Sequence, residues 1–324
     1  MKQKYFGYYF FWISCILVNN LYLIFLTSMK KPIINNELLG ILYMILCQFS
    51  FATNDAMVKF IYQNFDEIYV LNQVIFVRGL FALFFIGIFL YFKNLLNFRV
   101  IFSSRQLPIR GLFESFAAIC FFVGVAMLPF GMVYVLLSLA PIFLTTFGAL
   151  FLNEKVRWRR WTAVIFGFIG VVVVINPTKL EFGFYFIFPL LSAILLSFRD
   201  MYTKKIKGNF HSLQIAFITC LVVTIFFGFL SIYKFYYFSA QDYLILFVSS
   251  FFLSLGYIFS IATIKVALVS VTSTFRYSVI IWGILYGYFF FNEIPKTNTY
   301  IGAVMIVISG LIIISRQKQL GKIK

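Results

Sequence analysis

The chain has 324 residues, of which 62% are hydrophobic and only 11% are charged. Soluble domains carry roughly 45–50% apolar and about 25% charged residues, so this composition excludes a soluble enzyme, a secreted disulfide scaffold and a disordered chain. A transmembrane β-barrel is also excluded, because barrel strands alternate polar and apolar residues over about ten positions, whereas apolar runs here continue for about twenty. The composition indicates an all-α polytopic membrane protein.

The net charge of +17 comes from short basic clusters that lie between apolar runs. This distribution is typical of membrane proteins and argues against nucleic acid as a partner, because no soluble domain is present to offer a basic face. The four cysteines all lie inside apolar runs and lack metal-ligand spacing, so we expect no metal site and no bound cofactor.

The first apolar run, residues 5–27, follows Lys2 and Lys4 and is a separate problem. It is either a dispensable leader, with Met29-Lys30-Lys31 as the natural beginning, or an extra transmembrane helix. We treat residues 1–31 as this segment and expect that a chain starting at Met29 retains its function.

Ten further runs are each long enough to cross about 30 Å of hydrocarbon. We place these spans at residues 38–62, 69–92, 110–127, 132–152, 161–177, 182–202, 213–233, 243–264, 269–291 and 299–315. With residues before Leu38 on the cytoplasmic side, 19 Lys and Arg residues are cytoplasmic and four lie opposite. This asymmetry predicts a cytoplasmic C-terminus, and a helical bundle of this kind fits a bacterial inner membrane.

The two halves of the ten-span unit resemble each other. Phe151-Leu152-Asn153-Glu154 closes the fourth span, and Phe290-Phe291-Asn292-Glu293 closes the ninth, 139 residues later. Because five spans is an odd number, the second copy must enter the membrane in the opposite sense. We therefore expect a ten-helix inverted repeat (5+5), with copies at 32–177 and 178–315 and a basic tail at 316–324. This architecture is typical of secondary transporters and places the substrate near the midplane.

Short motifs strengthen this interpretation. They are Ala140-Pro141, Leu152-Asn153-Glu154, Arg160-Trp161, Gly167-x-x-Gly170-Val171, Asn176-Pro177, Arg276-Tyr277 and Phe291-Asn292-Glu293. Over residues 38–315 the chain resembles the ten-helix EamA type of the drug/metabolite transporter superfamily. Asn54-Asp55-Ala56-Met57-Val58-Lys59 and Phe275-Arg276-Tyr277 are similar to a subgroup that includes riboflavin and S-adenosylmethionine uptake transporters. The resemblance implies that Arg276 and Tyr277 line a substrate cavity.

Ionisable residues inside spans cost roughly 2.5–3.5 kcal/mol to insert, so each needs a partner, water or a function. Together with polar and aromatic neighbours they give the candidate substrate-binding residues, which are Asn54, Asp55, Lys59, Arg78, Glu114, Tyr134, Arg276, Tyr277 and Trp282. The three aromatic residues are candidates for stacking on a flat ligand.

Structural alternatives exist for the charged candidates. Asp55 and Lys59 are four residues apart on one helix face and can pair, or Lys59 can extend to the interface. Arg78 is a structural partner of Asp55 or Glu114 or part of the site, and Glu114 can pair with Arg110. Arg276 is the candidate that we favour most, because its planar guanidinium offers several donors.

Three further features have structural interpretations. Asn153-Glu154 and Asn292-Glu293 are expected to end helices and tie them to the next span. Gly283-x-x-x-Gly287 is expected to permit close helix contact, and Pro141 is expected to kink the fourth span.

The favoured function is a secondary transporter, not an enzyme, that moves a small organic metabolite by alternating access. The chain has no G-x-x-x-x-G-K-[ST] loop for ATP. Asp55 and Glu114 are matched by Lys59, Arg78 and Arg276, which argues against an acidic site for a cation and places uptake of riboflavin before uptake of S-adenosylmethionine. The alternatives are export of amino acids or other metabolites, a membrane-embedded enzyme, and a channel. The expected partners are the small-molecule substrate and the lipid bilayer. The sequence leaves both a monomer and a homodimer as alternatives.

Overall fold

The computed structural model describes residues 36–65, 67–97, 104–151, 158–175, 183–204, 206, 210–266 and 273–319, and within these ranges the regular structure is helical. The first half contains α2 (Asn36–Tyr62), α3 (Val70–Phe92), α5 (Gln106–Met127), α6 (Phe130–Leu137), α7 (Ala140–Phe151) and α8 (Trp158–Ile175). The second half contains α9 (Ile187–Lys204), α10 (Ser212–Ser231), α11 (Ala240–Val266), the 3₁₀ helix η1 (Ser273–Tyr277), α13 (Ser278–Phe291) and α14 (Thr297–Gln319). The N-terminal run at 1–31 and the Asn153-Glu154 motif lie outside the described residues.

These helices form because lipid cannot hydrogen-bond to the backbone, so an apolar span must satisfy its N–H and C=O groups internally. Five described helices, α2, α3, α5, α10 and α11, are long and apolar enough on their own to cross a membrane. Shorter apolar helices supply the other spans. A helix lies at each of the ten positions predicted from hydropathy, with ends that differ from the prediction by a few residues, and the fourth and ninth are each in two pieces.

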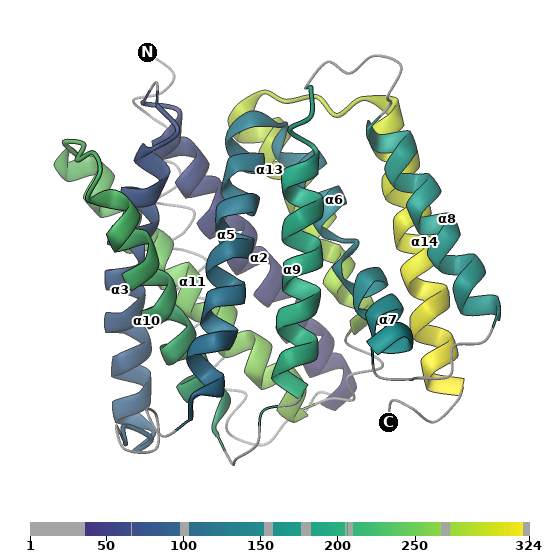
Figure 1. Ribbon diagram of the computed structural model, residues 1–324, viewed down its shortest axis with the longest axis horizontal. Helices are drawn as coiled ribbons and strands as arrows, with labels where there is room; N and C mark the ends of the chain where they lie inside the picture. The colour runs from purple at the N-terminus through teal and green to yellow at the C-terminus, as the bar shows by residue number, and fades with distance from the viewer. Residues whose placement is uncertain are drawn as a thin grey trace.

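The helix pairings follow the two-fold relation of an inverted repeat (Figure 1). α2 packs on α11, and the equivalent helix of the second copy, α9, packs on α5. Equivalent helices also pack on each other, namely α3 on α10, α6 on α13, and α8 on α14, which stand together at one side of the bundle. α2 and α9, the first helices of the two copies, run in opposite directions across the bundle (Figure 1).

The fourth and ninth spans are each divided. The fourth breaks at Ser138 and Leu139, just before Pro141, so the proline lies in the first turn of α7, where its missing N–H costs no helical hydrogen bond. The ninth begins as η1 and continues as α13. α13 ends at Asn292, whose left-handed φ of 52° closes the helix, so the expected role of this asparagine as a helix terminator is confirmed.

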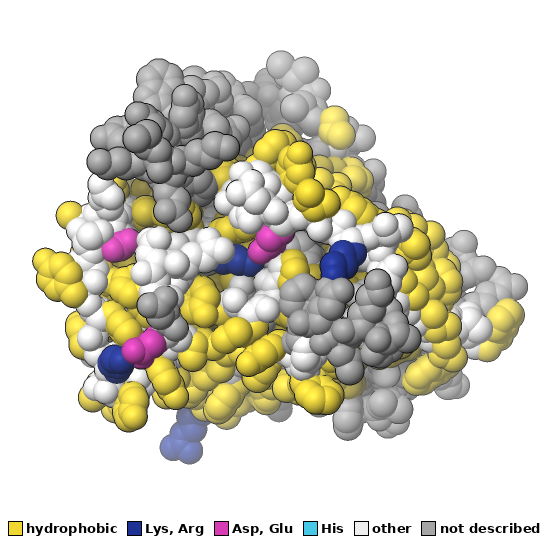
Figure 2. All heavy atoms as spheres, turned by 90° about the horizontal axis from the view of Figure 1, so that it is seen from above, with side chains coloured by type: hydrophobic (Ala, Val, Ile, Leu, Met, Phe, Trp, Pro, Cys, Tyr) yellow, Lys and Arg dark blue, Asp and Glu magenta, His cyan; other side chains and the backbone are white. Residues whose placement is uncertain are grey.

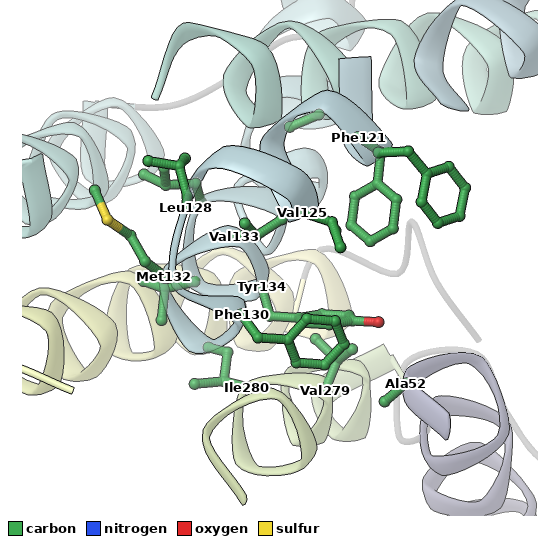
Figure 3. Close-up of a cluster of buried hydrophobic side chains, with 14 of the residues drawn as sticks. Ala52, Phe121, Val125, Leu128, Phe130, Met132, Val133, Tyr134, Val279 and Ile280 are labelled. Carbon is green, nitrogen blue, oxygen red and sulfur yellow. The ribbon is translucent and has the colours of Figure 1, made fainter. Parts of the chain in front are cut away.

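The α6–α13 contact forms part of the packed core at the centre of the bundle. Figure 3 shows Phe130 and Tyr134 of α6 lying against Val279 and Ile280 of α13. Gly283 permits this approach, since a Cβ there would lie 2.8 Å from the Cβ of Tyr134. The packing role expected for the Gly283-x-x-x-Gly287 motif therefore agrees with the structure.

Candidate functional site

Charged side chains gather at two levels of the bundle. We call the end where α3 finishes and α5 begins the basic end, since Lys93 and Arg105 lie there, and the other end the opposite end. The first group lies in the half nearer the opposite end, and the second lies in the half nearer the basic end.

The first group, the Asp55 cluster, joins α2, α3 and α6. Asp55 accepts hydrogen bonds from Asn54 Nδ2 at 2.7 Å and from the Tyr134 hydroxyl at 2.6 Å. Arg78 Nη1 donates to Asn54 Oδ1 at 3.2 Å and lies 3.8 Å from Asp55 Oδ1. Ser249 of α11 donates to the same Asn54 oxygen at 2.8 Å, so the cluster ties both copies together.

Arg78 is buried in this cluster, with 6% of its surface exposed. Its guanidinium lies 5.1 Å from the ring of Phe122, within range of a cation–π contact. Its Nε–H has no hydrogen-bond partner among the described residues. A buried guanidinium with an unused donor is a high-energy arrangement, which suggests a role beyond structure.

Beside this cluster, Glu293 closes the opposite end of the bundle. Lys59 Nζ donates to Glu293 Oε1 at 2.6 Å and to the Leu128 carbonyl at 3.1 Å. Glu293 Oε2 accepts from the Phe130 backbone N–H at 2.5 Å. One carboxylate from the second copy therefore holds α2 and the start of α6 from the first, and we call this set the Glu293 clamp.

Figure 2 looks onto this end of the bundle. Acidic and basic side chains lie side by side at two places on a face that is otherwise mostly apolar or uncharged. The ion pairs that the structure gives for the residues near this end are Glu293 with Lys59 and Glu67 with Lys234.

The second group, the Asp200 cluster, joins α5, α9 and η1. Arg199 donates to Glu114 Oε2 at 2.5 Å and to Asp200 Oδ1 through both Nε and Nη2, at 2.9 and 2.7 Å. Arg276 Nη1 lies 4.0 Å from the other Asp200 oxygen, and 46% of the Arg276 side chain is exposed. Arg110 donates instead to the hydroxyls of Thr203 and Thr219.

Between the two clusters lies Trp282, nine residues before the end of α13. At 1.5 Å per residue this is about 14 Å along the helix, close to half the hydrocarbon thickness. Its ring contacts Phe49 of α2 edge-on, with centroids 5.0 Å apart. Trp282 Nε1 and Ser278 Oγ, one helical turn away, are buried without hydrogen-bond partners in the described part of the chain.

Tyr277 lies apart from the other candidates. Its hydroxyl occupies the space beside Gly310 of α14, where an added Cβ would collide with it. The adjacent Arg276 lies near Asp200 of α9 instead, so these two neighbouring side chains contact different helices.

Sequence reasoning placed several charges near the right helices but paired some of them incorrectly. Lys59 neither pairs with Asp55 nor extends into the interface, because it is buried at 4% exposure against Glu293. Glu114 pairs with Arg199 of α9 instead of Arg110, which lies four residues earlier on its own helix. Glu293 is tied to α2 and α6 and not to the span that follows it.

Glu293, Arg199 and Asp200 were missing from the predicted site. Each lies at or near a helix end, where a charge is ordinarily assigned to solvent. The signal for Glu293 was its place in the repeated Asn-Glu motif, and the signal for Asp200 is the comparison of α9 with α2 developed below. Within the described ranges, no group of three or more His, Cys, Asp or Glu side chains is arranged to hold a metal ion.

An inverted helical repeat with ion pairs buried between its two copies defines a membrane transporter. The chain belongs to the EamA-like transporter family, whose model matches residues 38–176 and again 183–315.

Relatives with assigned functions cover most of the chain. The S-adenosylmethionine uptake transporter of Rickettsia conorii is 27% identical over 288 residues, 87% of this chain and 94% of that protein. The pseudopaline exporter CntI of Pseudomonas aeruginosa is 23% identical over 86% of this chain and 97% of its own length. The riboflavin transporter of Rhizobium johnstonii is 26% identical over 202 residues, 60% of this chain and 65% of that protein.

A solved crystal structure shares the fold. It superposes with a TM-score of 0.59 at 15% sequence identity and covers 88% of this chain and 98% of the other.

Proposed function

We propose that this protein imports a cofactor-type solute across the bacterial inner membrane by alternating access, with S-adenosylmethionine as the first candidate and riboflavin as the second. The order of the two candidates rests on how much of this chain each group of relatives matches. The relatives named for S-adenosylmethionine uptake match 87% of the chain, whereas the riboflavin transporters match 60% or less. This order reverses the one drawn from the sequence alone.

The structure keeps the excess of one cation behind the charge argument that favoured riboflavin, so the reversed order rests on coverage alone. That argument matched Asp55 and Glu114 with the deep cations and left out the acids at helix ends. Glu293 takes Lys59 and Asp200 shares Arg199, so four carboxylates and five cations lie in the two clusters and the clamp. A nearly balanced set of this kind suits a solute that carries charges of both signs.

Alternating access also finds support in the unequal closure of the two ends. The Glu293 clamp seals one end with Lys59 at 5% side-chain exposure, whereas Arg276 in the Asp200 cluster is 46% exposed. With the basic end in the cytoplasm, this is an inward-facing arrangement. To admit solute from outside, the protein would have to separate Glu293 from Lys59 and so open the opposite end.

Export is a second candidate, because the pseudopaline exporter matches 86% of the chain at 23% identity. Purified protein in liposomes, loaded with unlabelled solute and offered labelled S-adenosylmethionine or riboflavin outside, tests which solute is carried, and uptake by intact cells that express the protein tests the direction. Saturable counterflow of S-adenosylmethionine supports the proposal. Counterflow of riboflavin alone would reverse the order of the two, and an absence of flux for both would overturn import of either.

A further inference from the structure

The first helices of the two copies share the short motif Asp-x-x-x-Lys. α2 contains Asn54-Asp55-x-x-x-Lys59, and α9 contains Arg199-Asp200-x-x-x-Lys204. The motifs are 145 residues apart, which is also the offset between the starts of the two matched family ranges, 38 and 183. Asp55 and Asp200 are therefore equivalent positions of the inverted repeat.

Because α2 and α9 run in opposite directions (Figure 1), this equivalence places one carboxylate towards each end of the bundle. Asp55 lies seven residues before the end of α2, in the half nearer the opposite end. Asp200 lies four residues before the end of α9, in the half nearer the basic end. The repeat has thus produced one aspartate on each side of the midplane.

Each aspartate faces an arginine that it does not hydrogen-bond. The Asp55–Arg78 distance is 3.8 Å and the Asp200–Arg276 distance is 4.0 Å, both beyond hydrogen-bond range. Each carboxylate is fixed by other donors, Tyr134 and Asn54 for Asp55 and Arg199 for Asp200. The structural ion pairs nearby are much shorter, 2.6 Å for Lys59–Glu293 and 2.5 Å for Arg199–Glu114.

An unused arginine donor lies at the Asp55 level. Arg78 Nε is buried without a partner in the described part of the chain, although Arg78 is only 6% exposed. Buried polar groups in native structures are nearly always satisfied, so an orphaned donor calls for an unrecorded acceptor. The Arg276 guanidinium has no nearer acidic partner than Asp200 among the described residues.

We propose that Asp55–Arg78 and Asp200–Arg276 are two recognition sites for the zwitterionic α-amino-acid end of a solute, built on equivalent aspartates but on arginines from non-equivalent helices, α3 and η1. The arginine binds the solute carboxylate through its fork of donors, and the aspartate binds the ammonium group. A zwitterion inserted between the two charges adds no net charge to the interior. The solute would use the Asp200 site when the basic end is open and the Asp55 site when the opposite end is open.

This proposal rests on the proposed function and narrows its substrate class. S-adenosylmethionine carries an α-ammonium and a carboxylate, whereas riboflavin carries neither. The test compares S-adenosylmethionine with 5′-methylthioadenosine, which lacks both the amino-acid end and the sulfonium charge. S-adenosylhomocysteine, which keeps the amino-acid end on a neutral sulfur, separates these two losses and should bind like S-adenosylmethionine. Isothermal titration of each compound into the purified full-length protein in nanodiscs gives the affinities.

We expect the wild type to bind S-adenosylmethionine at least about tenfold more tightly than 5′-methylthioadenosine. Asp200→Asn and Arg276→Gln should remove this preference and leave 5′-methylthioadenosine affinity unchanged. Asp200→Glu, which keeps the charge, should restore part of it and shows that the site is folded. Asp242→Asn is the matched control, because Asp242 only caps the start of α11 through Ser239.

Equal wild-type affinities for S-adenosylmethionine and 5′-methylthioadenosine, or a preference that survives in both Asp200→Asn and Arg276→Gln, would overturn the proposal. Transport of riboflavin without binding of S-adenosylmethionine would leave a transporter standing and refute the zwitterion sites. Failure to move either solute in the liposome assay would contradict the proposed function and this proposal together.

Discussion

The Glu293 carboxylate lies 2.6 Å from the Lys59 ammonium group and joins the end of α13 to α2 across 234 residues of sequence. The same carboxylate accepts the Phe130 N–H at the start of α6, where a helix N-terminus favours negative charge. Lys59 also lies 4.9 Å from the ring of Phe291. Glu293 therefore links the end of α13 in the second copy to both α2 and α6 of the first at the opposite end.

Glu293→Gln is expected to lower the free energy of unfolding by on the order of 3 kcal/mol, because Lys59 stays buried without its counter-charge. Thermal unfolding in detergent, followed by loss of monodisperse protein, measures the effect. Glu67→Gln is the control, since the Glu67–Lys234 pair has a similar length but nearly half of each side chain is exposed. A loss of stability as large in Glu67→Gln as in Glu293→Gln would contradict the assignment of the clamp.

The sequence predicts the fold of this protein better than it predicts the contacts of the candidate site. Hydropathy places the second span at 69–92, and α3 occupies Val70–Phe92, because the length of an apolar run is a local property. The Asn-Glu motif likewise revealed the repeat. The partners of the charges were not predictable, since Glu114 chooses Arg199 of another helix over Arg110 one turn away, and that choice depends on how distant helices pack.

Gly310→Ala should displace Tyr277, because the new methyl group would take the space that the Tyr277 hydroxyl occupies. We expect lower thermal stability and reduced transport, since η1 also carries Arg276. Tyr277→Phe should not rescue Gly310→Ala, because Cζ and Cε2 of the ring, which phenylalanine keeps, also collide with the added Cβ. Gly87→Ala, where nothing lies within 4 Å of the added Cβ, should be neutral, and an equal loss in both alanine variants would refute the explanation.

Tyr134→Phe should weaken transport by about tenfold, the equivalent of one charge-assisted hydrogen bond, because the Asp55 carboxylate loses the hydroxyl at 2.6 Å. The ring packing against Gly283 is kept, so thermal stability should change much less than transport. Initial rates of uptake into liposomes measure this effect. Tyr288→Phe, on the exposed side of α13, should retain full rates, and a matching loss there would show that the effect is not specific to Asp55.

The loops at the opposite end should respond to acid. Hydrogen bonds from Lys234 and Tyr236 hold the pKa of Glu67 below its usual value of 4.5. A carboxylate with a lowered pKa stabilises the folded state above its unfolded pKa, and this contribution is lost as the pH falls through the folded value. Wild type should therefore lose its stability advantage over Glu67→Gln as the pH drops below about 4.5, in thermal unfolding measured from pH 7 downward. A stability difference between wild type and Glu67→Gln that grows as the pH falls would contradict the lowered pKa of Glu67.

Arg276→Ala should abolish transport while the protein stays inserted and monodisperse. The reason is that the Arg276 side chain is 46% exposed and its one ion pair, with Asp200, spans 4.0 Å, so the fold gains little from it. Arg276→Lys keeps the charge but loses the planar fork, and it should restore less than the wild-type rate if the arginine binds a carboxylate through two donors. Arg105→Ala, an exposed arginine at the same end of the bundle, controls for loss of positive charge. Full transport by Arg276→Ala would remove this arginine from the site and leave the loose Asp200 contact as a surface ion pair.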